Sequence, residues 1–202
     1  RAAIEADQAG RQYGQFAGSM SGTFDVDAWS RAAEMEKAGE YRDEIFEATG
    51  FFRGPDKKWR FEISDADATL KLNMVYKLTG KLKRDTANLA DVLDHPKLFA
   101  AYPDLRDYWT SIEIGPDVKK PGGFFEADVK RIEVRAQTAD EARSILLHEI
   151  AHAIQRIEGF ANGGNLSMGE TYEGDRVEFF QSDISKLVDE WERVATELDG
   201  AT

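Results

Sequence analysis

The sequence has 202 residues, a net charge of −12 and no cysteine. That length allows one domain with its own hydrophobic core, and the missing cysteines exclude disulfides and thiolate metal sites. The acidic charge argues against nucleic acid as a partner, and no apolar run reaches the roughly 20 residues that a membrane span needs. Residues 1–25 are small, polar and glycine-rich, so we expect a partly ordered lead-in there and the domain itself over residues 26–202.

The next part of the chain predicts two short helices. They are expected at Val26–Lys37 and Tyr41–Ala48, because Gly39 separates them and Thr49-Gly50 ends the second. The apolar stripe of the first helix, formed around Trp29 and Ala33, is only modest.

The central part predicts strands with loops and short helices between them. Apolar and polar residues alternate in Trp59–Ile63, Ile112–Ile114 and Ile132–Val134, as in half-buried strands. Residues 70–108 are apolar but interrupted by prolines, which favours loops and short helices packed over the sheet. The turn before Phe124-Phe125 predicts a hairpin with the strand at Ile132.

The C-terminal part predicts two longer helices. Thr138 and Glu141 form the pattern of a capping box, and the helix that they begin should run to Glu158, before Gly159. A second helix is expected from Asp175 to Leu198, because apolar residues recur there at helical spacing. This apolar stripe predicts core packing rather than a cofactor site.

The first of these helices carries an H-E-x-x-H motif, formed by His148, Glu149 and His152. Residues four positions apart lie on one helix face, so both imidazoles can bind one zinc ion. Glu149 is then placed to act as general base toward a water molecule and as general acid toward the leaving amine. The motif predicts zinc-dependent hydrolysis.

The surroundings of the motif support this interpretation. Two of the three histidines lie in it, and the opposite helix face is apolar. The strand at Ile132–Val134 lies just upstream, as the edge strand of a zincin does. Two alternatives stay open: a surface helix with two unrelated histidines, and a site that binds metal but cleaves nothing. The four apolar residues of the opposite face are Leu146, Leu147, Ile150 and Ile154.

The third metal ligand is less well defined by the sequence. His95 more plausibly packs or caps a short helix, and position 158, where metzincins have their third histidine, is a glutamate. An acidic residue from the following helix is therefore expected, as in gluzincins. The candidates in order are Glu178, Glu173 and Glu170, with Asp175 also within reach, and each could equally be a solvated acid.

Three further features could belong to the site. Gln155 lies seven residues after His148 and could line the site, orient a ligand, or simply be exposed. Tyr172 could stabilise an oxyanion. The loop from Gly159 to Gly164 could form a wall or lid of the cleft.

The run from Leu146 to Gln155, continued by Glu158–Ala161 and Gly163-Gly164, resembles the zincin-like domain of phage and mobile-element large polyvalent proteins. The stretches Glu44–Gly54, Trp59–Ile63 and Leu93–Leu105 resemble the same family, so the similarity covers about Val26 to Gly164. Beyond Gly164, Tyr172 followed by Glu178 only loosely resembles the family's acidic helix and lacks its arginine. The resemblance implies a metallopeptidase of a phage or mobile element that could be delivered into a host cell.

Together these observations predict an α+β, zincin-like fold, in which the motif helix and a second long helix pack on a small, mostly antiparallel sheet. The predicted function is zinc-dependent hydrolysis of a peptide bond in a protein, with a host protein as one possible substrate. The predicted location is the cytoplasm, with delivery by a virion as a variant of it. The alternative is an inactive zincin-fold interaction or virion structural module, and hydrolysis of a non-peptide amide would use the same residues.

Overall fold

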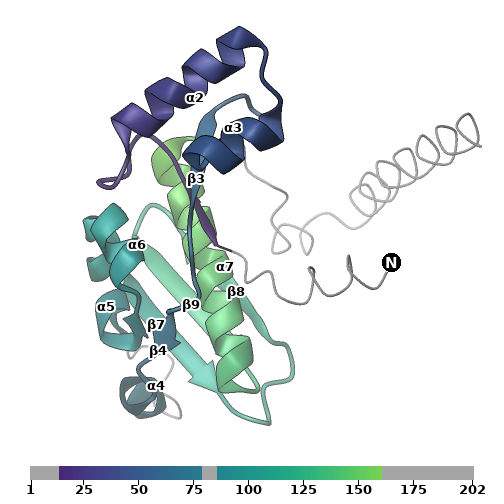
Figure 1. Cartoon of the computed structure of the whole chain (residues 1–202). Helices are drawn as coiled ribbons and strands as arrows, with labels where there is room; N and C mark the ends of the chain where they lie inside the picture. The colour runs from purple at the N-terminus through teal and green to yellow at the C-terminus, as the bar shows by residue number, and fades with distance from the viewer. Residues whose placement is uncertain (1–13, 79–85, 161–202) are drawn as a thin grey trace, which may run out of the picture. The chain divides into compact units, whose positions relative to one another are not determined.

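A computed structural model describes residues 14–78 and 86–160 of the chain (Figure 1). Over these residues the protein is a mixed α+β structure with small sheets. The helix expected at Asp175–Leu198 lies outside the described residues. No helix among those described is long and apolar enough to cross a membrane.

The N-terminal sheet has three antiparallel strands in the order β1-β3-β2. They are β1 (Gln15–Ala17), β2 (Phe51–Arg53) and β3 (Trp59–Ile63), and the middle strand is the one whose alternation predicted it. Strand β1 was not predicted, because three residues in a glycine-rich stretch show no periodicity. It nevertheless pairs along its length with β3, from Gln15 opposite Ile63 to Ala17 opposite Phe61.

Two helices, α2 (Val26–Ala38) and α3 (Arg42–Thr49), pack beside this sheet and confirm the sequence prediction. The Asp25 side chain caps α2 by accepting a hydrogen bond from the backbone N–H of Ala28 at 2.9 Å. Both helices end at a glycine with positive φ, 86° at Gly39 and 75° at Gly50, a conformation that costs glycine little.

The central sheet has the strand order β5-β7-β9-β8. Its strands are β5 (Ala87–Asn88), β7 (Trp109–Ile114), β8 (Gly122–Glu126) and β9 (Arg131–Ala136). The predicted hairpin is confirmed, with Phe125 opposite Ile132, while β7 and β9 run parallel. The assignment of the Ile132–Val134 strand to the sheet edge was wrong: the hairpin places β8 outside it, so β9 is an interior strand.

Short elements connect the two sheets and confirm the expected mixture of loops and short helices. Two of them, β4 and β6, pair antiparallel with each other. The remaining ones contact one another and the central sheet. They are β4 (Thr69–Leu70), α4 (Leu72–Leu78), α5 (Leu89–Val92), β6 (Leu93–Asp94), α6 (Pro96–Ala101) and a 3₁₀ turn, η1 (Pro103–Asp107).

The long helix α7 (Ala139–Glu158) contacts β9, β8 and β1, and Figure 1 shows it running alongside the central sheet. Its predicted N-cap is confirmed, because Thr138 Oγ1 accepts a hydrogen bond from the N–H of Glu141 at 3.2 Å. The capping box is incomplete: the Glu141 carboxylate accepts from the N–H of Gln137 at 2.7 Å rather than from Thr138. Gly159 ends the helix with a φ of 62°.

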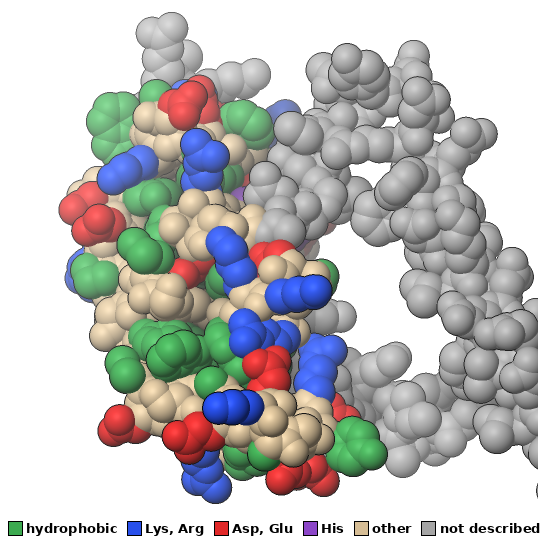
Figure 2. All heavy atoms as spheres, turned by 90° about the horizontal axis from the view of Figure 1, so that it is seen from above, with side chains coloured by type: hydrophobic (Ala, Val, Ile, Leu, Met, Phe, Trp, Pro, Cys, Tyr) green, Lys and Arg blue, Asp and Glu red, His purple; other side chains and the backbone are tan. Residues whose placement is uncertain are grey.

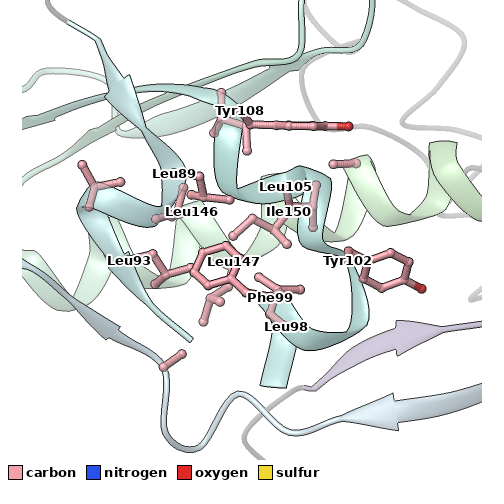
Figure 3. Close-up of a cluster of buried hydrophobic side chains, with 14 of the residues drawn as sticks. Leu89, Leu93, Leu98, Phe99, Tyr102, Leu105, Tyr108, Leu146, Leu147 and Ile150 are labelled. Carbon is pink, nitrogen blue, oxygen red and sulfur yellow. The ribbon is translucent and has the colours of Figure 1, made fainter. Parts of the chain in front are cut away.

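The core lies between α7, the central sheet and the short helices. Figure 3 shows side chains from α7, α5, α6 and η1 meeting in one cluster. The apolar back predicted for the motif helix is confirmed, since its four members are all less than 10% exposed. Burial of such side chains contributes about 1.5–3 kcal/mol each, so α7 is held firmly by the face opposite to its histidines. On the outside, Figure 2 shows acidic and basic side chains interspersed with hydrophobic ones.

Candidate metal centre

The two motif histidines lie one helical turn apart on α7, with His148 on the exposed side and His152 half-buried. Their Nε2 atoms face each other at 3.1 Å. The rings are nearly perpendicular, with an interplanar angle of 86° and centroids 4.6 Å apart. The regular helix therefore brings together the two nitrogen atoms that the sequence selected as ligands.

This geometry fits a zinc ion. Two imidazole nitrogens at about 2.0–2.1 Å from zinc, with a tetrahedral angle between them, lie about 3.3–3.4 Å apart. The observed 3.1 Å between the Nε2 atoms of His148 and His152 needs only a small adjustment to reach that separation. The two histidines could thus hold the metal together without a change in the backbone of α7.

Glu149 lies on the side of α7 that faces β8 and is only 4% exposed. A Cβ atom built on Gly123 in β8 would lie 2.6 Å from both Cγ and Oε1 of Glu149 and 2.7 Å from Cγ2 of Ile145. The carboxylate is therefore enclosed between helix and strand. Burial raises the pKa of Glu149, and the nearby His152 partly opposes this rise. A raised pKa is what a general base working near neutral pH needs.

Burial lowers the pKa of His148, and the neighbouring His152 lowers it further. The neutral imidazole is the form that binds a metal ion, so both effects favour the binding form at neutral pH. Gln155 lies one turn beyond His152, and its Oε1 is 3.1 Å from Nδ1 of that ring. The sequence left open whether Gln155 lines the site, orients a ligand or is simply exposed. In the structure its side chain contacts His152, a candidate ligand.

His95 and Glu158, neither of which was predicted as a ligand, have structural partners elsewhere. His95 is fully buried, with Nε2 at 2.8 Å from the Asp65 carboxylate and Nδ1 accepting from the N–H of Leu98 at the start of α6. It caps a short helix, as predicted. Glu158 accepts hydrogen bonds from the backbone N–H of Gly18 and from the Tyr102 hydroxyl, at 3.1 and 2.7 Å, so its carboxylate has a structural role at the end of α7.

The remaining part of the predicted site concerns the third metal ligand and the oxyanion group. Among residues 14–78 and 86–160, no group of three His, Asp or Glu side chains lies close enough to hold a metal ion. The third-ligand candidates Glu178, Glu173, Glu170 and Asp175 lie outside the described residues, as does the oxyanion candidate Tyr172. Their roles stay predictions.

Two features of the site were not predicted from the sequence. Gly123 lies against Glu149, and a glycine inside a strand segment is a recognised sign of close backbone approach. Gln15 donates hydrogen bonds from Nε2 to the Asp65 carboxylate and to the backbone carbonyl of Leu147, directly before His148, at 2.8 and 3.3 Å. No local signal identifies this second contact, because 132 residues separate its partners.

Comparison with protein families gives one match. Residues 14–71 match the family described as Large polyvalent protein associated domain 23. The segment includes the N-terminal sheet with α2 and α3, and it ends before α7. The match supports a large polyvalent protein as the context of this chain. Comparisons with curated proteins and with solved structures give no match.

Proposed function

We propose that this chain, which carries a large polyvalent protein associated domain, is a zinc-dependent peptidase domain with a zincin-like fold. The observation that carries the proposal is the pairing of His148 and His152 through their Nε2 atoms at 3.1 Å, next to the enclosed carboxylate of Glu149. Two imidazole nitrogens and a buried acid on one helix are the protein groups that metal-assisted hydrolysis uses.

Each residue of the motif has a defined task in this proposal. His148 and His152 would hold the metal, which when bound polarises a substrate carbonyl and makes water more acidic. Glu149 accepts the proton of the attacking water and passes it to the nitrogen of the leaving amine. Strand β8 keeps bulk water away from one side of this carboxylate, so that the proton stays between Glu149 and the substrate.

The position of β8 supports a peptide as the substrate. Within the described part of the chain, β8 pairs only with β9, so its other edge has unpaired backbone groups. An extended peptide can pair with such an edge. Because Gly123 of β8 lies against Glu149, a peptide bound there would pass close to the general base. The large polyvalent protein context makes a host protein one candidate substrate, and the cytoplasm one candidate location.

The first test is the zinc content of the untagged protein, measured by elemental mass spectrometry. Wild type should hold close to one zinc per chain, and His148→Ala and His152→Ala should hold almost none, because each variant loses one of the two nitrogen ligands. Arg156→Ala is the matched control, since Arg156 is exposed one turn further along α7. Absence of zinc from wild type after supplementation would overturn the proposal and favour an interaction or virion structural module.

Glutamine substitutions of the acidic candidates test the third ligand. The variant among Glu178→Gln, Glu173→Gln and Glu170→Gln that loses zinc identifies the residue, while the other two keep it.

Catalysis is tested with a library of fluorogenic peptides. Wild type should cleave some members, and Glu149→Gln should keep its zinc and lose cleavage by a factor of about 10² or more. Cleavage by Glu149→Gln at the wild-type rate would exclude this residue as the general base. Zinc binding without cleavage of any peptide or protein substrate would favour the inactive module over the peptidase.

A further inference from the structure

Gln155 contacts the ring nitrogen of His152 that points away from the paired Nε2 atoms. Its Oε1 lies 3.1 Å from His152 Nδ1, and the two residues are three positions apart on α7. An amide oxygen can only accept a hydrogen bond, so this contact requires the hydrogen of a neutral His152 to be on Nδ1. The lone pair is then on Nε2, the atom that faces His148.

The end of helix α7 holds Gln155 in place. The backbone carbonyl of Gln155 accepts hydrogen bonds from the N–H groups of Gly159 and Phe160, the latter at 2.9 Å. These bonds are formed by the left-handed turn at Gly159, whose φ is 62°. Phe160 is itself buried. The helix cap therefore fixes the backbone of the residue whose side chain contacts His152.

The chemistry of the amide matters for this contact. A neutral acceptor selects the hydrogen position on the ring without placing a charge next to His152. Hydrogen bonds to the outer nitrogen of a metal-binding histidine fix the orientation of the ring and are worth roughly 10–100-fold in metal affinity. A glutamine exposed for solubility alone would have no such effect on the histidine.

We propose that Gln155 is a positioning residue that holds His152 with its hydrogen on Nδ1, so that Nε2 is ready to bind the metal. The inference rests on the proposed zinc site, and it adds a residue outside the H-E-x-x-H motif to it. Gln155 does not touch the metal or the substrate, so its effect should appear in the metal affinity and in the state of the imidazole ring.

The first measurement is the zinc dissociation constant, obtained by competition with a chelator of known affinity. Gln155→Leu keeps a side chain of similar size but cannot accept a hydrogen bond, and it should weaken zinc binding roughly 10–100-fold. Gln155→Glu keeps an acceptor oxygen and should bind zinc no more weakly than wild type. Arg156→Leu is the matched control on the neighbouring, exposed position and should leave the affinity unchanged.

The second measurement is the position of the hydrogen on His152 in the metal-free protein, read from long-range ¹H–¹⁵N correlation spectra of the imidazoles. Wild type should show His152 with its hydrogen on Nδ1, and Gln155→Leu should lose that preference. A hydrogen on Nε2 of His152 in wild type would overturn the inference, because it would mean that the Gln155 amide nitrogen faces the ring and donates to it.

These results separate the two proposals. If wild type binds zinc and His148→Ala does not, but Gln155→Leu binds it as tightly as wild type, the zinc site stands and the role of Gln155 is wrong. If wild type binds no zinc, the proposed function fails by itself, and the role of Gln155 in metal binding fails with it. Thermal unfolding of Gln155→Leu checks that any weaker binding is not caused by loss of the fold.

Discussion

At the scale of single residues, the site depends on how closely β8 approaches α7. Gly123 leaves room for Glu149 because it has no side chain. The preceding residue of the strand, Gly122, is exposed, and a Cβ atom there would meet no other atom within 4 Å. An alanine at Gly123 would therefore collide with Glu149, whereas an alanine at Gly122 would collide with nothing. The pair of substitutions tests whether the position of Glu149 matters.

Gly123→Ala should reduce peptide cleavage strongly while leaving the zinc content unchanged. The new methyl group would displace the Glu149 carboxylate, and a misplacement of about 1 Å can cost about 10²-fold in rate. The measurement is kcat together with metal content, and Gly122→Ala is the control that should behave like wild type. Equal activity of the two variants would show that Glu149 can move without losing its function.

Glu149 also predicts a dependence of stability on pH in the metal-free protein. Burial raises the pKa of Glu149 above its value in the unfolded chain, so the folded state holds this proton more tightly. The free energy of unfolding therefore decreases as pH rises from the unfolded pKa through the folded pKa. Below the unfolded value, about pH 4, the carboxyl is protonated in both states, and the free-energy cost of burying the ionised carboxylate is absent.

The isosteric variant Glu149→Gln tests this cost of burying the ionised carboxylate, because its side chain has nearly the same shape and no charge. It should be more stable than wild type at pH 7, and the difference should disappear below about pH 4. Urea unfolding of the two metal-free proteins at a series of pH values measures it. Glu40→Gln, at an exposed position, is the control. A destabilised Glu149→Gln at pH 7 would mean that the ionised carboxylate is stabilised in the folded state.

At the scale of elements, the middle and the C-terminal end of α7 are attached to the N-terminal segment. Near its middle, Gln15 of β1 contacts the Leu147 carbonyl, and at its end Glu158 receives hydrogen bonds from the turn after β1. Lys58 adds a third link by donating from Nζ to the Glu158 carbonyl at 3.1 Å. These contacts join α7 to the segment that matches the large polyvalent protein family.

Glu158→Ala should lower the free energy of unfolding by about 2–4 kcal/mol. It removes the acceptor of two backbone N–H groups and of the Tyr102 hydroxyl, and each buried donor left without a partner costs about 1–3 kcal/mol. Tyr102→Phe removes one hydrogen bond and should cost about 1 kcal/mol. Denaturant unfolding measures both, and equal losses in the two variants would contradict the shared role assigned to Glu158.

The sequence predicted the elements whose signal is local. Periodicity and capping residues identified α2, α3, β3, β9 and α7 with boundaries close to those observed. The order of strands was not predictable in the same way, because whether β8 or β9 forms the edge depends on pairing between distant residues. For the site, helical spacing alone brought His148 and His152 together, whereas the contact of Gly123 with Glu149 depends on how a strand packs on a helix.

At the scale of the whole molecule, the segment that matches the family model and helix α7 belong to one structural unit. Strand β1 contributes Gln15 and Ala17, 3% and 0% exposed, to the interior beneath α7. The lead-in that the sequence assigned to residues 1–25 therefore includes a strand of the N-terminal sheet. The segment that matches the family supports the helix with the histidines.

A chain shortened to residues 26–202 should be less stable by at least about 3 kcal/mol. It loses the pairing of β1 with β3 and the Gln15 contacts, and each such hydrogen bond contributes about 1 kcal/mol. For a chain of this size the loss corresponds to a fall of about 6–12 °C in Tm. Calorimetry of both proteins measures it, and an unchanged Tm would show that β1 contributes little to the unit.

The contacts between β1 and α7 also determine when the domain can fold. They join residues 132–140 positions apart, so they form only after nearly all of the described chain has been synthesised. Contacts at such long range slow folding, and a ribosome-bound chain holds β1 without its partner until α7 emerges. The same late step that closes the structure brings His148 and His152 into place. A nascent chain that stops before Ala139 therefore has neither a closed core nor the two histidines of the candidate metal centre.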